Sequence, residues 1–372
     1  MSVPLIDLKA QQRRLGDRID KAIAAVLDHG QFIMGSEVFE LEERLADYCG
    51  VRHAISCSSG TDALVLALLA WEVGPGDAVV VPTFTFAATA EAVALLGATP
   101  VFADSLPGTY NIDPASAEAA VAAAREAGLR PAGLVAVDLF GQPAAYAELE
   151  QLARSHGLWV LADAAQSFGA TYRGKRTGGL GDMAATSFFP AKPLGCYGDG
   201  GAVFTDDDAL AEVARSLRVH GTGTDKYDNV RVGINGRLDT IQAAVLLQKL
   251  DVFDDELVAR QRVADRYRRG LPPSVVLPQV APETTSAWAQ YTITAPARDA
   301  LAARLAENGI GTAIYYRRPV HQQPAYEAAP VAGPSLPVAE ELAGIVLSLP
   351  MHPYLSPDDQ DQVIAAVSAA VG

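Results

Sequence analysis

Short apolar runs that do not alternate with polar residues recur through the first half of the chain, and a turn and a helical pattern follow each of them. Such runs are typical of strands buried on both faces, as in a parallel sheet covered by helices. The repeated order of strand and helix predicts an α/β fold with a mostly parallel central sheet. In this class of fold, ligands bind beyond the carboxyl ends of the strands. The clearest runs are Asp77–Val81, Thr99–Asp104, Leu134–Asp138 and Leu158–Ala162.

The chain is too long for a single hydrophobic core. It has 372 residues, whereas single cores usually stop growing at about 250–300 residues. We therefore expect a large α/β domain over residues 1–249 and a smaller α+β domain over residues 250–372. A helix that begins near Arg237 and continues to about residue 269 would connect them. In the second domain the patterns predict strands at Trp288–Ile293 and Ile310–Tyr316, and helices at Asp299–Asn308 and Ser356–Val371.

Composition excludes several classes of function. A net charge of −15 argues against a surface for nucleic acid or anionic membranes, although it permits a local basic pocket. No apolar run approaches the length of a membrane span, and the N-terminus lacks the pattern of a signal peptide. The six histidines show no metal-ligand spacing. Cys49, Cys57 and Cys196 are widely spaced and form no CxxC motif, so we expect a reducing, cytoplasmic location.

One lysine, Lys192, lies in the apolar, glycine-rich segment Ser187–Gly201. Loss of hydration favours the neutral, nucleophilic form of an amine. A neutral lysine amine can form a Schiff base with an aldehyde or ketone. Four of residues 195–201 are glycine, which lets the backbone approach another group closely. Taken alone, this pattern also fits a surface lysine beside a glycine-rich turn.

Three further patterns lie where predicted strands end. The turn Ser58–Asp62 precedes an apolar helix, so Gly60 and Thr61 would offer free N–H groups to a phosphate. A plain helix N-cap is the alternative. Phe86 follows a second strand, as a ligand contact or as a core residue. Asp163 ends a third strand, either as an N-cap or as a buried acid that faces a cationic ring.

These patterns converge on one ligand. A phosphate turn, an aromatic face, a strand-end acid and a desolvated lysine match the phosphate, ring, ring nitrogen and aldehyde of pyridoxal 5′-phosphate. A carboxylate that faces the pyridine nitrogen keeps it protonated, and the protonated ring then serves as an electron sink. We therefore expect this cofactor.

Six motifs carry a resemblance that covers essentially the whole chain. They are Cys57–Leu64 (CSSGTDAL), Pro82–Ala90 (PTFTFAATA), Asp163–Ser167 (DAAQS), Ser187–Lys192 (SFFPAK), Tyr197–Gly201 (YGDGG), and Asn235–Asp239 (NGRLD) followed by Gln242-Ala243-Ala244. In this order they resemble the DegT/DnrJ/StrS family of sugar aminotransferases. The resemblance implies the fold-type-I, aspartate aminotransferase-like architecture.

The resemblance implies a role for each residue around the cofactor ring. Lys192 is the implied Schiff-base lysine and proton shuttle, and Asp163 pairs with the pyridinium. Gln166 is placed near the ring and its phenolic oxygen, and Phe86 against the ring face.

The resemblance also implies how the phosphate is held. Gly60, Thr61 and Ser187 are the implied phosphate ligands within one subunit. Asn235 is implied to reach the phosphate of the neighbouring subunit, so the active site needs a homodimer. The long polar loop 220–236 fits such an exchange.

For the reaction, the resemblance implies that L-glutamate gives its amino group and a keto sugar on a nucleotide diphosphate receives it. Segments Ser187–Thr205 and Leu347–Leu355 are most similar to the branch that aminates C3 of UDP-2-acetamido-2-deoxy-3-oxo-glucuronate. Arg237 would bind the carboxylate of that sugar with two hydrogen bonds. Its alternative role is an ion pair on a helix surface.

Gly236, Tyr315 and Arg317 differ from the pattern of that branch, at positions where the sugar is expected to lie. We expect Tyr315, Tyr316 and His321 to contact the substrate, and Arg317 is a candidate for a replacement cation. The alternative substrate is a dTDP-3- or 4-keto-deoxyhexose, in antibiotic or surface-glycan synthesis. Two further alternatives are a sugar dehydratase, in which a histidine replaces the lysine, and a cofactor-binding regulator without turnover.

Overall fold

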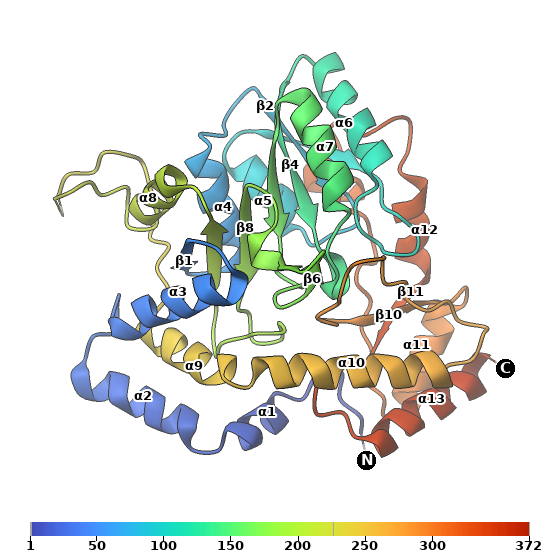
Figure 1. Ribbon diagram of the computed structural model, residues 1–372. Coiled ribbons are helices and arrows are strands. Elements are labelled where there is room, and N and C mark those ends of the chain that lie inside the picture. Colours follow the sequence, from blue (N-terminus) through green and yellow to red (C-terminus); the bar gives the residue numbers. More distant parts are fainter. Residues whose placement is uncertain (1, 226, 372) are drawn as a thin grey trace.

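The computed structural model describes residues 2–225 and 227–371 (Figure 1). Its centre is a seven-stranded sheet in the order β1-β9-β8-β5-β4-β2-β3. The five strands from β8 to β3 in this order are mutually parallel, and β9 is antiparallel to both of its neighbours. The expected mostly parallel sheet is therefore confirmed. The strands are β1 (His53–Cys57), β2 (Asp77–Pro82), β3 (Thr99–Ala103), β4 (Arg130–Val137), β5 (Trp159–Asp163), β8 (Met183–Ser187) and β9 (Gly201–Thr205).

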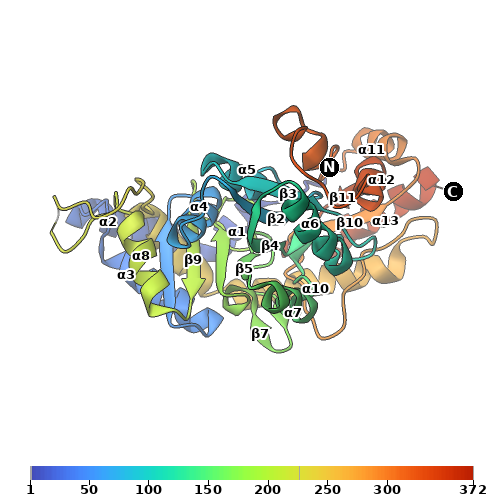
Figure 2. The same cartoon turned by 90° about the horizontal axis from the view of Figure 1, so that it is seen from above.

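Helices cover both faces of this sheet. Figure 2 shows α4 (Gly60–Ala70) and α5 (Ala88–Leu95) on one side, and α6 (Pro114–Glu126) and α7 (Tyr146–His156) on the other. Helix α4 is apolar on every side because it lies between the sheet and the helices α5 and α8 (Asp208–Leu217). The sheet and these helices enclose one large hydrophobic core.

Below the sheet in the view of Figure 1 lie, among others, the helices α1 (Leu8–Leu15), α2 (Arg18–His29), α3 (Ser36–Cys49), α9 (Thr240–Leu250) and α10 (Phe253–Gly270). The prediction of one long helix to residue 269 is wrong, because the chain breaks it between α9 and α10. The N–H of Val252 donates to the carbonyl of Lys249, three residues back, which closes a turn. Arg18 and Arg44 hold the carboxylate of Asp251 at this turn.

The C-terminal part forms a second hydrophobic cluster, to which Val3 from the N-terminus also contributes. It contains the antiparallel pair β10 (Tyr291–Thr294) and β11 (Val346–Leu349), with helices α11 (Arg298–Glu307) and α13 (Pro357–Val371). Helix α12 (Pro337–Ile345) packs on the first core instead. The domain boundary at residue 250 stays a prediction. A short pair, β6 (Thr171–Tyr172) and β7 (Lys175–Arg176), completes the strands.

The predicted strand at Ile310–Tyr316 is wrong. Only isolated bridges form there, between Ile310 and Val3 and between Ala313 and Ser348. The segment then leaves the small sheet, and Tyr316 packs against Phe84 of the large domain. Side-chain contact with the first core has therefore replaced backbone pairing. Within the described part of the chain, no helix combines the length and apolarity that a membrane crossing requires.

Candidate active site

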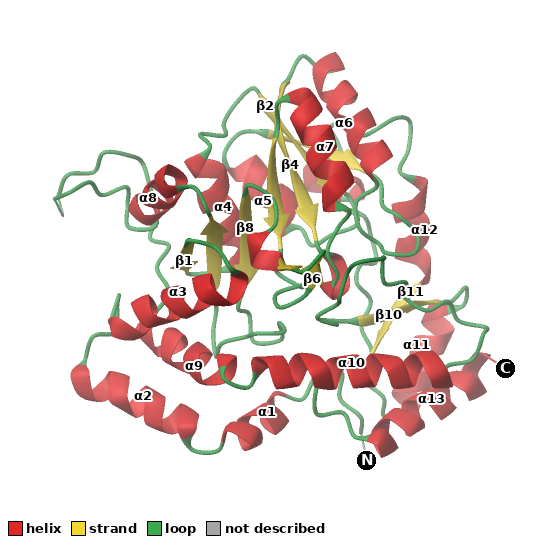
Figure 3. Cartoon of the chain, viewed as in Figure 1, coloured by secondary structure: helices red, strands yellow, loops and turns green. Residues whose placement is uncertain are grey.

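The loops that follow the parallel strands gather between the sheet and helix α10 (Figure 3). Strand register places the ends of three central strands side by side, because Val137 pairs with Asp163, and Asp163 pairs with Ala185. Most of the predicted site residues come from these loops. The carboxyl edge of the sheet is therefore the candidate site.

Lys192 lies in the loop that joins β8 to β9. Its N–H donates to the carbonyl of Phe189 at 2.9 Å, and its side chain is half-buried. Burial lowers the pKa of the Lys192 ammonium, and the nearby charge of Asp163 opposes that shift. The protein therefore favours the neutral amine that nucleophilic chemistry needs.

Asp163 ends strand β5 and is almost fully buried. Burial raises the pKa of this carboxyl, whereas the N–H of Ala165, the charge of Lys192 and the hydroxyl of Thr89 lower it. The Thr89 hydroxyl donates to Oδ2 at 3.0 Å, and the Ala165 N–H donates to Oδ1 at 3.2 Å. A buried acid with a positive charge nearby is suited to face a cationic ring.

Gly60 and Thr61 form the first turn of α4, which Ser59 caps by accepting a hydrogen bond from the N–H of Asp62. A Cβ atom added at Gly60 would lie 2.5 Å from Cβ of Ser187. Gly60 therefore permits a direct contact between this turn and the end of β8, which brings Gly60, Thr61 and Ser187 together. Free N–H groups, a helix N-terminus and one hydroxyl form a cradle for an anion.

Gln166 and Tyr316 close another side of the site. The amide of Gln166 accepts from the N–H of Phe140 at 2.8 Å and donates to the hydroxyl of Tyr316 at 3.2 Å. Burial raises the pKa of the Tyr316 phenol. The ring of Phe86 lies 6.4 Å from that of Tyr316 and is 59% exposed, so Phe86 is available to stack on a ligand.

Asn235 and Arg237 lie on a turn before α9, where Asn235 is exposed and Arg237 is half-buried. Arg237 Nε donates to Oδ1 of Asn235 at 2.9 Å. The carbonyl of Gly236 between them accepts from the N–H of Ser58 at 3.0 Å, which ties this turn to the phosphate cradle of the same chain. Which subunit's site Asn235 serves stays a prediction.

The predicted sugar-binding residues are divided between two environments. Tyr315 is half-buried next to Tyr316, with 5.8 Å between their rings. His321 shares a hydrogen bond of 2.6 Å with the hydroxyl of Thr83 and lies 3.4 Å from a carboxylate oxygen of Glu340. Arg317 forms an exposed ion pair with Asp299. The structure therefore brings Tyr316 into the candidate site and ties His321 to Thr83, which follows β2 at the same edge, while Arg317 is paired with Asp299 on α11.

Sequence reasoning missed Thr89 and Asp138. Thr89 lies in the motif Pro82–Ala90. Its hydrogen bond to Asp163 depends on the orientation of helix α5, which the local sequence does not show. Asp138 follows β4 and accepts from the N–H of Ala144 and the hydroxyls of Tyr146 and Ser167. Burial raises its pKa to about 7 against the effect of these donors, and the charge of Asp163 adds to the rise. Its position at the end of an apolar strand was the available signal.

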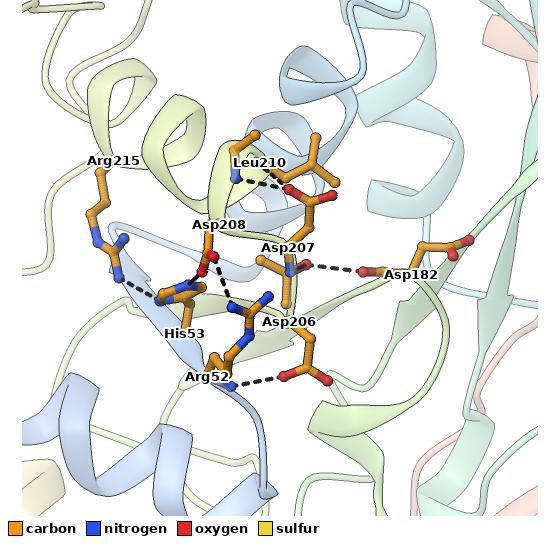
Figure 4. Close-up of polar contacts among 10 residues, drawn as sticks. Arg52, His53, Asp182, Asp206, Asp207, Asp208, Leu210 and Arg215 are labelled. Atoms are coloured by element: carbon orange, nitrogen blue, oxygen red, sulfur yellow. Dashed lines mark hydrogen bonds and ion pairs between the residues drawn. The ribbon is translucent and has the colours of Figure 1, made fainter.

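A hollow of about 900 Å³ lies at the opposite edge of the sheet. Its carboxylates already have partners (Figure 4). Asp208 pairs with Arg52 at 2.8 Å and with His53 at 2.7 Å, and Asp207 caps α8. Asp206 accepts from the N–H of Arg52. These bonds connect β1 to α8. Because these three carboxylates are already satisfied by partners, we assign them a structural role.

The residues at the carboxyl edge fit pyridoxal 5′-phosphate. Gly60 permits a close-packed anion cradle next to Ser187. Asp163 places a buried carboxylate within electrostatic range of Lys192, whose amine is shifted toward neutrality. The cradle matches the phosphate of the cofactor, Asp163 matches its ring nitrogen, and Lys192 matches its aldehyde.

Comparison with known proteins agrees with this site. Residues 13–368 match the model of the DegT/DnrJ/EryC1/StrS aminotransferase family. The chain is 47% identical to a UDP-2-acetamido-2-deoxy-3-oxo-D-glucuronate aminotransferase from Pseudomonas aeruginosa, over 98% of this chain and 99% of the relative. It is 44% identical to a dTDP-3-amino-3,4,6-trideoxy-alpha-D-glucose transaminase from Streptomyces venezuelae, over 98% of this chain and 95% of that protein.

A crystal structure of a DegT DnrJ EryC1 StrS aminotransferase from Brucella abortus is 50% identical, with a TM-score of 0.97. The superposition covers 99% of each chain. The expected fold and the expected class of enzyme are thereby confirmed. This chain belongs to the DegT/DnrJ/EryC1/StrS aminotransferase family.

Proposed function

We propose that this aminotransferase uses pyridoxal 5′-phosphate to move an amino group from L-glutamate to a keto sugar carried on a nucleotide diphosphate. The observation that carries the proposal is the location of Lys192 within electrostatic range of the buried Asp163, at the same edge of the sheet as the cradle at Gly60 and Ser187. The best candidate substrate is UDP-2-acetamido-2-deoxy-3-oxo-glucuronate, on which the Pseudomonas aeruginosa relative acts according to its name.

The bound cofactor would supply an electron sink that stabilises negative charge at the carbon that loses a proton. Asp163 keeps the ring nitrogen protonated, because its buried carboxylate gains a cationic partner there. Lys192 Nζ would take the proton from Cα of glutamate in the first half-reaction and deliver it to the carbon of the cofactor that carried the aldehyde. In the second half-reaction Nζ would take a proton from that carbon and deliver it to the sugar carbon that receives the amine.

The other residues bind and orient. The N–H groups of Gly60 and Thr61 and the hydroxyl of Ser187 hold the phosphate, which fixes the ring relative to the lysine. Gln166 and Tyr316 form a hydrogen-bonded wall beside the ring, and Phe86 covers its face. This wall limits the access of water to the reacting carbons.

We further propose that the enzyme is a homodimer in which Asn235 reaches the partner's site. The loop that follows α8 and precedes Asn235 extends from the body of the subunit (Figure 1). Val232 on this segment is 92% exposed, and Phe32 and Ile33 are about half exposed beside the start of α9. Apolar side chains left open in this way are typical of subunit interfaces. The three buried free thiols agree with the expected cytoplasmic location.

The nature of the sugar is open to a direct experiment. The UDP-sugar and dTDP-sugar relatives are almost equally similar to this chain, at 47% and 44% identity. Arg237 is half-buried at the turn beside the phosphate cradle, where it can bind a sugar carboxylate. An amination assay with glutamate should compare UDP- and dTDP-linked keto sugars, with and without a carboxylate.

We expect the uronic acid to be aminated fastest. Arg237→Ala should slow that reaction about 100-fold, since a bidentate charge-assisted pair contributes about 1.5–3 kcal/mol. A neutral sugar should be affected less than threefold. Equal losses on both substrates would reject carboxylate recognition by Arg237. Preferred amination of a dTDP-keto-deoxyhexose would replace the proposed substrate with the alternative.

A further inference from the structure

Lys249 is a buried lysine outside the site described above, on the helix that runs below the carboxyl edge of the sheet (Figure 1). It is only 1% exposed. Its ammonium donates to the carbonyl of Gly195 at 2.5 Å and lies 4.2 Å from the centre of the Tyr197 ring. Both partners belong to the loop that carries Lys192.

That loop, residues 188–200, lacks regular secondary structure. Internal bonds close part of it, from the N–H of Lys192 to the carbonyl of Phe189 and from the N–H of Cys196 to the carbonyl of Phe188. Gly195 packs directly on the backbone of Phe189 and Pro190, where a Cβ atom would lie 2.6 Å from either carbonyl oxygen. A shift of Gly195 would therefore move the residues just before Lys192.

Two side chains on one face of α9 hold this loop from outside. Gln242 accepts from the N–H of Tyr197 at 2.8 Å, and Lys249, two turns further along the helix, donates to Gly195. Burial lowers the pKa of the Lys249 ammonium to about 8, while the charges of Cys196 and Glu256 oppose the shift. A lysine placed where burial opposes its charge needs a compensating role.

We propose that Lys249 is a positioning residue. Its hydrogen bond to the Gly195 carbonyl and its cation–π contact with the Tyr197 ring hold the turn around Lys192 in place. The same helix begins one residue after the segment 235–239, so α9 connects the lysine loop to the turn that bears Asn235 and Arg237. This inference rests on the proposed role of Lys192, but its structural half concerns the protein without cofactor.

The test uses Lys249→Met, which keeps the chain length and removes the charge and the donors. Val245→Ala is the matched control, because Val245 lies on the same helix but packs on Leu15 and Ile19 instead of on the loop. The first readout is amide hydrogen exchange in cofactor-free protein. Loss of a charge-assisted bond should speed exchange within residues 188–200 by about 10-fold or more. Exchange in the sheet and in α9 should change little.

The second readout is the thiol of Cys196, which is buried and donates to the carbonyls of Phe188 and Gly198. In Lys249→Met this thiol should react faster with an aromatic disulfide reagent, and Cys196→Ala in the same background should remove the gain. The third readout is the half-reaction with glutamate, where we expect a lower rate constant at an almost unchanged KM.

Unchanged exchange of the loop in Lys249→Met, or an equal acceleration in Val245→Ala, would overturn the proposal. If Lys249→Met does not fold, Lys249→Gln and Tyr197→Leu remove the two contacts separately and should each give part of the effect. If the loop opens but no half-reaction exists even in the wild type, the proposed function fails while the loop anchor stands. If the loop opens and the half-reaction is unaffected, the anchor is structural and the positioning role is rejected.

Discussion

The two edges of the central sheet both carry acids and basic side chains, but they use them differently. At the carboxyl edge, Asp163 and Lys192 are withdrawn from water, and burial shifts each pKa toward the neutral form of the group. At the opposite edge, Asp208 is exposed and paired, and its bonds to His53 and Arg52 lower its pKa. The hollow of about 900 Å³ lies at this opposite edge, where the charged groups already have partners. Chemistry therefore follows the desolvated groups and not the size of the hollow.

The largest effect should come from Lys192→Ala at the carboxyl edge. Without an amine to move the proton, turnover should fall by about 10⁴-fold, the upper range of general acid–base catalysis. Transamination between glutamate and 2-oxoglutarate, followed by isotope exchange, measures it without a known sugar. Retained activity within tenfold of the wild type would remove Lys192 from the mechanism.

Asp163→Asn compared with Asp208→Asn tests the two edges with the same chemical change. Asp163→Asn removes the charge that keeps the ring nitrogen protonated. If the pKa of that nitrogen falls by about two units as a result, the rate should fall by about 100-fold. Asp208→Asn should change the rate less than twofold, because this ion pair is exposed to solvent and lies away from the chemistry. Comparable losses in both variants would contradict the comparison.

Thr89→Val compared with Thr205→Val makes the same comparison for hydroxyl groups. Thr89 donates to the Asp163 carboxylate, and Thr205 donates to the carbonyl of Asp182 at the opposite edge. We expect Thr89→Val to slow the glutamate half-reaction about 10-fold, since a bond to a charged group contributes about 1.5–3 kcal/mol. Thr205→Val should reduce thermal stability and leave the rate unchanged. The reverse pattern would assign the catalytic role to the wrong edge.

Asp138→Asn should have the smallest effect on rate but a clear effect on the pH dependence of stability. The pKa of Asp138 is raised to about 7 in the folded protein, above its unfolded value. The folded state thus holds the proton more tightly, so this group stabilises the protein at low pH and loses that contribution as the pH rises toward 7. Asp208, whose pKa is lowered, contributes with the opposite sign. Urea unfolding from pH 2 to pH 8 measures both, because the contribution of Asp208 is lost mainly below the ordinary Asp pKa of about 3.9.

In Asp138→Asn the wild-type loss of stability between pH 4 and pH 7 should become smaller. In Asp208→Asn the loss on acidification should become smaller instead. If both variants changed the pH profile in the same direction, the contrast between the two edges would be wrong.

Much of the site could be predicted from the sequence because strand ends meet at one edge of a parallel sheet. Gly60, Asp163 and Lys192 are far apart in the chain, yet each lies at or just beyond the carboxyl end of a buried strand, which was enough to group them. The turn Ser58–Asp62 could also be predicted as an anion site, because its residues are small and a helix N-terminus follows directly.

The remainder depends on packing that the local pattern does not contain. The break between α9 and α10 occurs where Arg18 and Arg44 arrive from other helices to bind Asp251. The apolar segment 310–316 looked like a strand, but its neighbours in space are the rings of the large domain and not a pairing strand. The burial of Lys249 also depends on such packing, since nothing in the local sequence shows that a glycine-rich loop covers it.

We propose that Lys192 bonds covalently to the cofactor at the carboxyl edge. Borohydride reduction of protein reconstituted with pyridoxal 5′-phosphate converts a Schiff base into a stable adduct, and peptide mapping then locates it. We expect one modified lysine, Lys192, and we expect that adduct to be lost after prior incubation with glutamate. An adduct on Lys249 or on a surface lysine, unchanged by glutamate, would contradict it.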